Sequence, residues 1–167
     1  DSKSPVSLSF LNDKNEADYI FYKEHPHHLL DFTYPEIKPD DIVIFGSFYA
    51  VNPMIRPQVL GLLDYARSHG AIIYYDVNFR PAHKDEVIRV TPKLIENLDY
   101  ADIVRGSHED FATLYKKEDA DKVYNAEISF YCKQFIYTQG SQPVEVRSGR
   151  TLKKSYPVLD TNVISTI

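Results

Sequence analysis

Three polar side chains of different chemistry follow one apolar run of the sequence. Directly after residues 71–75 come Asp76, Asn78 and Arg80, which place an acid, an amide and a guanidinium at alternate positions. In an extended backbone successive side chains point to opposite faces, so these residues would share one face at a strand end. Ligands of open α/β sheets bind beyond the carboxyl ends of the strands, so the pattern favours a charged, hydroxyl-rich ligand. The alternative is a polar loop in which Arg80 pairs with Asp76.

Length and composition exclude several classes of protein. The chain has 167 residues, 43% of them hydrophobic and 26% charged, as expected of one soluble domain. A net charge of -5 argues against non-specific binding to nucleic acid or to an anionic membrane. No apolar run approaches a membrane span, and Cys132 is the only cysteine, which suits a reducing compartment. We therefore expect a cytoplasmic protein with no nucleic-acid or membrane partner, in which Cys132 lies buried in a helix.

The elements that must position the polar triplet are a hairpin followed by alternating strands and helices. Residues 6–11 and 19–22 are separated by the turn cluster 12–15, which indicates a β-hairpin within residues 4–24. Strands are expected at 41–45, 71–75, 101–104 and 134–138, helices at 59–66, 91–98 and 107–115, and a closing hairpin at 144–146 and 153–155. Strands separated by helices pair in parallel through right-handed crossovers, so residues 41–167 should form an α/β core.

Two of these helices carry start signals. Thr91 and Pro92 have the types preferred at an N-cap and in the first helical turn. Ser107 and Asp110 have the spacing of a capping box.

Taken in order, these segments resemble the middle of a ribokinase-like (PfkB) carbohydrate kinase, most closely the bacterial fructokinases. The resemblance rests on Asp76-x-Asn78-x-Arg80, on Ala-Asp-Ile-Val at 101–104, and on Thr138-Gln139-Gly140. The segments 4–8 and 19–22 resemble the strands that cover the sugar in this family. The resemblance implies a three-layer fold with a parallel sheet flanked by helices, of which residues 1–167 would be a part, with a lid at 4–24.

What the resemblance implies about activity is ATP-dependent phosphorylation of a sugar hydroxyl, of fructose or a related ketose, with Mg²⁺. Arg80 would stabilise the transferred phosphate and contact the sugar, because a guanidinium can donate two parallel hydrogen bonds. Asn78, Thr138 and Gly140 would join Arg80 in binding the nucleotide, and Asp76 would orient Arg80 or its loop. Tyr19 and Phe21 would cover the sugar, and the lid could also pair subunits in a homodimer.

The sequence departs from the family pattern at two places. Where the family carries Asn-x-x-Glu near the Mg²⁺ and phosphate network, this chain has Ser107 and Asp110. Asp110 could act on a metal through water, or it could be only a helix cap. The family's Gly-Ala-Gly-Asp signature, which supplies the catalytic base and the anion hole, is expected just after residues 160–161. These 167 residues do not contain it, so we expect them alone to be inactive.

Two alternatives stay open at this point. A 2-keto-3-deoxygluconate kinase shares the lid and the Asp-x-Asn-x-Arg pattern, although an aromatic Phe21 favours a neutral sugar over an acid. A non-catalytic α/β domain that binds a nucleotide would also fit the pattern.

Overall fold

The structure, a computed structural model, describes residues 6–11, 17–22 and 31–159. The chain divides into two compact units, one of Asp1–Leu29 with Leu159–Ile167 and one of Leu30–Val158. The first contains the strands β1 (Val6–Leu11) and β2 (Ala17–Tyr22), which pair antiparallel with Val6 opposite Tyr22. The predicted hairpin is therefore confirmed, while its turn at 12–15 and the ends of the predicted lid lie outside the described residues.

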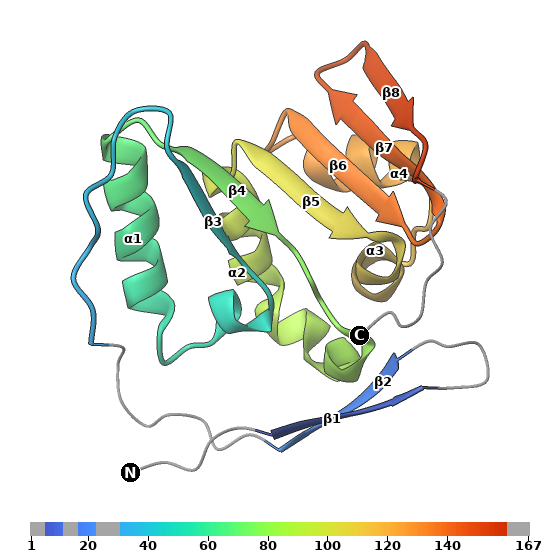
Figure 1. Ribbon diagram of the computed structural model, residues 1–167, viewed down its shortest axis with the longest axis horizontal. Coiled ribbons are helices and arrows are strands. Elements are labelled where there is room, and N and C mark those ends of the chain that lie inside the picture. The colour runs from blue at the N-terminus through green and yellow to red at the C-terminus, as the bar shows by residue number, and fades with distance from the viewer. Residues whose placement is uncertain (1–5, 12–16, 23–30, 160–167) are drawn as a thin grey trace. The chain divides into compact units, whose positions relative to one another are not determined.

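The second unit is built on a six-stranded sheet in the order β3-β4-β5-β6-β7-β8 (Figure 1). The strands are β3 (Ile42–Gly46), β4 (Ile72–Asp76), β5 (Ile103–Ser107), β6 (Gln134–Gln139), β7 (Gln142–Ser148) and β8 (Leu152–Tyr156). The pairs from β3 to β6 are parallel, and β6-β7 and β7-β8 are antiparallel. Both the predicted crossovers and the predicted closing hairpin are present.

Helices and short helical turns connect these strands. They are α1 (Arg56–Ser68), α2 (Val87–Tyr100), α3 (His108–Tyr115) and α4 (Ala120–Val123), with the 3₁₀ turns η1 (Phe48–Val51) and η2 (Pro81–Glu86) and the π-helical turn η3 (Tyr124–Ile128). All four helices contribute to the hydrophobic clusters on one face of the sheet. Leu63 of α1 packs in the cluster that contains Ile73, and Leu94 of α2 packs in the cluster that contains Tyr75. Burying a side chain of this size stabilises the fold by about 1.5–3 kcal/mol.

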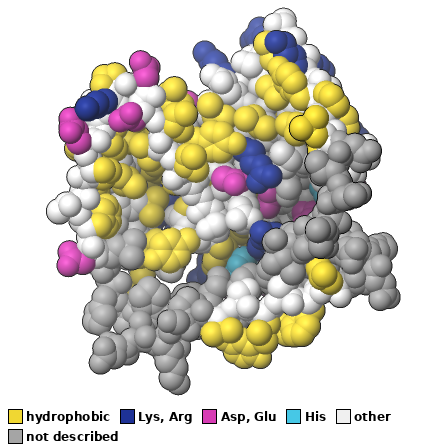
Figure 2. All heavy atoms as spheres, in the orientation of Figure 1, with side chains coloured by type: hydrophobic (Ala, Val, Ile, Leu, Met, Phe, Trp, Pro, Cys, Tyr) yellow, Lys and Arg dark blue, Asp and Glu magenta, His cyan; other side chains and the backbone are white. Residues whose placement is uncertain are grey.

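The opposite face of the sheet carries side chains of the alternate positions. Ile42 and Ile44 of β3 are 60% and 69% exposed, and Ile72, Tyr74 and Ile103 on the neighbouring strands are half-buried. Hydrophobic side chains extend across this face in Figure 2, with an acidic and a basic group side by side near its middle. Towards the carboxyl ends of the strands the same face becomes polar.

The predicted start of α2 was wrong. The helix begins at Val87, so Pro92 lies inside it, and Thr91 is not its cap. Val90, Leu94 and Leu98 form one buried stripe at helical spacing, and burying this stripe outweighs the one backbone hydrogen bond that Pro92 cannot donate. The Thr91 hydroxyl instead donates to the Val87 carbonyl at 2.7 Å, within the helix.

Two further predictions of local structure need correction. Ala101 is the C-cap of α2, and β5 begins at Ile103 and continues to Ser107, beyond the predicted end at Val104. Cys132 is buried as predicted, but it lies in the connection after η3 rather than in a helix. Its thiol donates to the carbonyls of Asp102, at 3.1 Å, and of Gln134, at 3.2 Å, so polar backbone groups fix its position.

Candidate active site

Arg105 connects three neighbouring strands at the carboxyl edge of the sheet. Its side chain leaves β5 and donates from one terminal nitrogen to Asp76 of β4, at 3.0 Å from Oδ1. The other terminal nitrogen donates to the Thr138 hydroxyl of β6, at 2.9 Å. The side chains of Arg105 and Asp76 are 32% and 35% exposed, so the pair is open to solvent and to a ligand. This polar group lies where open α/β sheets bind ligands.

Asp76 therefore pairs with Arg105, a partner that the sequence did not predict, and its expected role in orienting Arg80 or the loop stays a prediction. The main chain around Asp76 is also tightly held, because its carbonyl accepts from the Ser47 N–H at 3.1 Å. A Cβ at Gly46 would lie 1.9 Å from the same carbonyl oxygen, so only glycine allows β3 and β4 to approach here. Burial, with the nearby Asp76 carboxylate as a second cause, raises the pKa of Tyr74.

The predicted alternation beyond β4 is present in the burial of the side chains. Val77 and Phe79 are buried, Asp76 and Asn78 are half-buried, and Arg80 is exposed. The strand nevertheless ends at Asp76, and Asn78 has a φ of 38°, which the short amide side chain tolerates better than most residues. Arg80 then has an extended conformation and precedes the turn η2. Asn78 and Arg80 thus flank a buried Phe79 in a shaped loop.

Asp110 holds this loop from the neighbouring helix. One oxygen of its carboxylate accepts from the Phe79 N–H at 2.6 Å, and the other accepts from the Ser107 N–H at 2.6 Å and hydroxyl at 2.8 Å. The Ser107 hydroxyl in turn accepts from the Asp110 N–H at 3.2 Å, which completes the predicted capping box. Burial raises the pKa of Asp110, although these hydrogen bonds oppose the shift.

These contacts do not favour a metal at Asp110. Asp110 is 4% exposed, and each of its carboxylate oxygens already accepts a hydrogen bond from within the protein. Within residues 6–11, 17–22 and 31–159, no group of at least three His, Cys, Asp or Glu side chains could hold a metal ion. A role for Asp110 on Mg²⁺ through water stays a prediction.

Thr138 and Gly140 lie at the end of β6, next to the Arg105 group. Gln139 pairs with Gln142 across the turn to β7, and Gly140 within that turn has a φ of +54°. The turn alone therefore explains a glycine at this position. Apart from its two chain neighbours, no atom of the described residues lies within 4 Å of where a Cβ of Gly140 would be, which leaves space for a ligand on that side.

Tyr19 and Phe21 are placed on β2, in the first unit, and their side chains lie outside what the structure describes. Their predicted contact with a sugar therefore stays a prediction.

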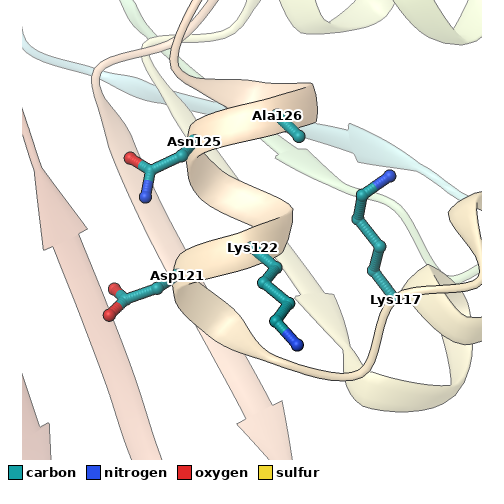
Figure 3. A pocket seen from close by; sticks show the side chains of 5 residues that line it. All are labelled: Lys117, Asp121, Lys122, Asn125 and Ala126. Atoms are coloured by element: carbon teal, nitrogen blue, oxygen red, sulfur yellow. The ribbon is translucent and has the colours of Figure 1, made fainter.

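A separate hollow of about 410 Å³ lies over α4 and η3, lined by Lys117, Asp121, Lys122, Asn125 and Ala126 (Figure 3). Lys117 is paired with Glu127, and Asp121 with Arg147 and Lys153, so internal ion pairs account for two of the charged side chains of this hollow.

Arg105 is the residue that the sequence-based prediction missed. The predicted strand ends at Val104 and the predicted helix begins at Ser107, so Arg105 lies in neither element. The signal was present in the sequence, since Ile103 and Arg105 alternate with Val104 and Gly106 up to the Ser107 cap. Extending the strand to the cap would have placed a cation beside the end of β4.

In the described part of the chain, no helix has the length and apolar character needed to cross a membrane.

The fold of this chain is shared with proteins of known structure. No protein-family model matches the chain, and no curated protein matches its sequence. Solved structures do match it, and they include fructokinases and a PfkB protein from Polaromonas sp. JS666. The chain therefore has the ribokinase-like fold of PfkB carbohydrate kinases, as the resemblance implied.

Three of these structures give the extent of the similarity. Fructokinase from Vibrio cholerae O395 in its apo form has a TM-score of 0.72 and 16% identity, over 99% of this chain and 56% of that chain. Fructokinase from Xylella fastidiosa with bound ATP has a TM-score of 0.71 and 22% identity, over 97% and 51%. Aminoimidazole riboside kinase from Salmonella enterica, complexed with aminoimidazole riboside and an ATP analogue, has a TM-score of 0.66 and 18% identity, over 79% of this chain and 44% of that chain. The chain spans about half the length of the structures it matches.

Proposed function

We propose that this chain belongs to an ATP-dependent sugar kinase of the PfkB type that phosphorylates a hydroxyl of a ketose such as fructose. The observation that carries the proposal is the polar group of Asp76, Arg105 and Thr138 across the ends of three neighbouring strands. Anchored loops with Asn78 and Arg80 on one side and with Gly140 on the other extend from this edge. The fold of known sugar kinases supports the same conclusion.

In the proposed reaction, the residues of this chain position charge rather than form covalent bonds. Phosphoryl transfer needs alignment of the reactants, neutralisation of phosphate charge and a base near the hydroxyl. ATP supplies the transferable phosphoryl group. Arg80 would donate to its phosphate oxygens and Asn78 to the phosphate or the sugar, while Asp110 keeps their loop in shape through the Phe79 N–H. Thr138 and Gly140 would lie against the nucleotide.

The remaining parts of the proposal concern the first unit and the partners. Tyr19 and Phe21 would exclude water from the sugar, because transfer to water would waste ATP. The lid, residues 4–24, would cover the sugar and could pair two copies in a homodimer, and residues 41–167 would form the α/β core. We propose a cytoplasmic location and no nucleic-acid or membrane partner, in keeping with the net charge of -5.

The test is steady-state kinetics of the complete gene product, with ATP and sugar varied separately. Arg80→Lys keeps the charge but loses the guanidinium fork, and Arg80→Ala loses both. We expect kcat/KM to fall about tenfold or more for Lys and further for Ala, which is roughly 1.4 kcal/mol or more of transition-state stabilisation. A thermal melt of each variant controls for folding. Near-normal kinetics in a folded Arg80→Ala protein would remove Arg80 from the site.

The choice of substrates separates the alternatives. Turnover of 2-keto-3-deoxygluconate but not of fructose would identify the acid-sugar kinase instead. A gene product that binds ADP but phosphorylates neither sugar nor any of a panel of ketoses would favour the non-catalytic nucleotide-binding domain. The 167 residues alone should show no turnover above background, and clear activity from them would contradict the assignment of the base to another segment.

A further inference from the structure

We infer that Arg105 is a positioning residue for the nucleotide, and that it acts by directing the single hydroxyl proton of Thr138 towards a phosphate oxygen. This inference rests on the proposed function, and it adds a residue for which the family resemblance gave no role. Its starting point is the way the guanidinium is shared between two partners of different chemistry, a carboxylate on β4 and a hydroxyl on β6.

The two bonds fix the guanidinium in one orientation. One terminal nitrogen of Arg105 contacts both oxygens of Asp76, at 3.0 and 3.4 Å, and the other contacts the Thr138 hydroxyl at 2.9 Å. A guanidinium is planar and its donors form a rigid fork, so the pairing with Asp76 also sets the position of the second arm. A lysine has three rotatable donors on a single nitrogen and no rigid fork, so it could not hold this geometry.

The direction of the Thr138 bond follows from the donors available. A guanidinium has no acceptor, so the Thr138 oxygen must accept from Arg105 and its own proton must be donated elsewhere. Among the residues that the structure describes, the Thr138 hydroxyl donates to the Gly106 carbonyl at 3.5 Å, well beyond the usual 2.5–3.0 Å for a hydroxyl donor. This weak bond is easily exchanged for one to a ligand oxygen. Accepting from a cation also polarises the hydroxyl and makes it a stronger donor.

The exposure of the group permits a ligand to reach it. Arg105 and Asp76 are each about one third exposed, and Thr138 is half-buried at the strand end that precedes the open Gly140 turn. An anion beside Thr138 would meet a directed proton, a nearby positive charge and an unobstructed backbone. Those are the features by which proteins hold the phosphates of a nucleotide.

The experiment measures ADP binding to the complete gene product by isothermal titration calorimetry. Arg105→Met removes the fork with little change in volume, and Thr138→Val removes the hydroxyl and keeps the shape. We expect each change to weaken ADP binding by about tenfold, and the double variant to be weaker than either single variant by less than about twofold, because both act through one hydroxyl. If the fork matters, Arg105→Lys should bind ADP with an affinity close to that of Arg105→Met. In kinetics, KM for ATP should rise while kcat changes less than KM.

The matched control is Arg147→Met, which removes another arginine of this sheet that bridges two side chains, Asp121 of α4 and Glu145 of β7. It should lower the melting temperature and leave the dissociation constant for ADP within about twofold of the original value. Unchanged ADP affinity in Arg105→Met, or effects of the single variants that multiply in the double variant, would overturn the inference.

The outcomes for the unmodified protein separate this inference from the proposed function. ADP binding without phosphorylation of any sugar would refute the kinase proposal and leave the role of Arg105 to be decided by the variants. Phosphorylation of a sugar with unaltered nucleotide affinity in Arg105→Met would refute only the inference. No binding of ADP by the unmodified protein would refute the inference directly.

Discussion

Arg105 and Arg147 lie on the same sheet and each joins two side chains, but the two arginines differ in burial and in their partners. Arg147 of β7 donates to Asp121 of α4 at 2.6 Å and to Glu145 of β7 at 3.0 Å, and its side chain is 9% exposed. Arg105 has one acid and one neutral hydroxyl as partners, and its side chain is 32% exposed.

The difference separates an arginine that holds the fold from one that can serve a ligand. Arg147 fastens a helix to the sheet, and two carboxylates compensate its charge, so it has little to offer an incoming anion. Within the described residues, Arg105 forms an ion pair with one carboxylate, that of Asp76, and it polarises a hydroxyl whose bond to the Gly106 carbonyl is 3.5 Å long. Burial and the identity of the partner thus distinguish the two roles.

The largest effect on stability should come from Arg147→Met. Removing one member of a buried ion pair costs about 3–5 kcal/mol, but Asp121 and Glu145 are 39% and 27% exposed and can be solvated, so we expect about 2 kcal/mol. Arg105→Met should cost about 0.5 kcal/mol, as for other exposed pairs. Urea denaturation measures both changes. If Arg105→Met were the more destabilising variant, Arg105 rather than Arg147 would be the arginine that holds the fold, and the distinction drawn here would be wrong.

A smaller loss of stability is expected for Asp110→Asn, which removes the carboxylate that holds the loop around Phe79. The amide cannot accept from both the Phe79 and the Ser107 N–H groups, so the free energy of unfolding should fall by about 1–2 kcal/mol at pH 7.

This loss should also depend on pH. Because burial raises the folded pKa of Asp110 above 3.8, the unmodified protein loses stability as pH rises through that pKa. The cost of Asp110→Asn should therefore be greater at about pH 4 than at pH 7. A cost that is smaller at the lower pH would contradict the raised pKa.

The smallest effect should be a change in how stability depends on pH, caused by Asp121, the partner of Arg147. Hydrogen bonds from Lys153, and next from Arg147, lower the folded pKa of Asp121 below 3.8. The stability that Asp121 contributes is therefore present above pH 3.8 and is lost as pH falls through the folded pKa. In acid titrations followed by circular dichroism, Asp121→Asn should reduce the loss of stability in this range. Asn125→Ala, on the same face, serves as a control that removes no charge.

The sequence was sufficient for the order of the elements because each carries its own local signal. Continuous apolar runs predicted the parallel strands, and Ser107 with Asp110 predicted the cap of α3. The burial of Val77 and Phe79 between Asp76, Asn78 and Arg80 was also predictable from alternation alone.

The predictions that failed depend on contacts between distant segments. Thr91 and Pro92 carry a valid start signal, which the packing of Val90 and Leu94 against the sheet overrides. The pairing of Asp76 with Arg105, 29 residues further on, was not predicted, because no local pattern points to this partner. The register of β4 with β5 places Asp76 opposite Arg105, so the pairing became visible only when the two strands were aligned.

The burial of Cys132 makes it a chemical reporter for the part of the sheet farthest from these strand ends. It is the only cysteine in the 167 residues, it is 2% exposed, and burial raises the pKa of its thiol. Only the thiolate reacts with an alkylating reagent, so the folded protein should resist labelling. Because the thiol bonds to carbonyls just before β5 and at the start of β6, its rate of labelling would measure how often these two strands separate there.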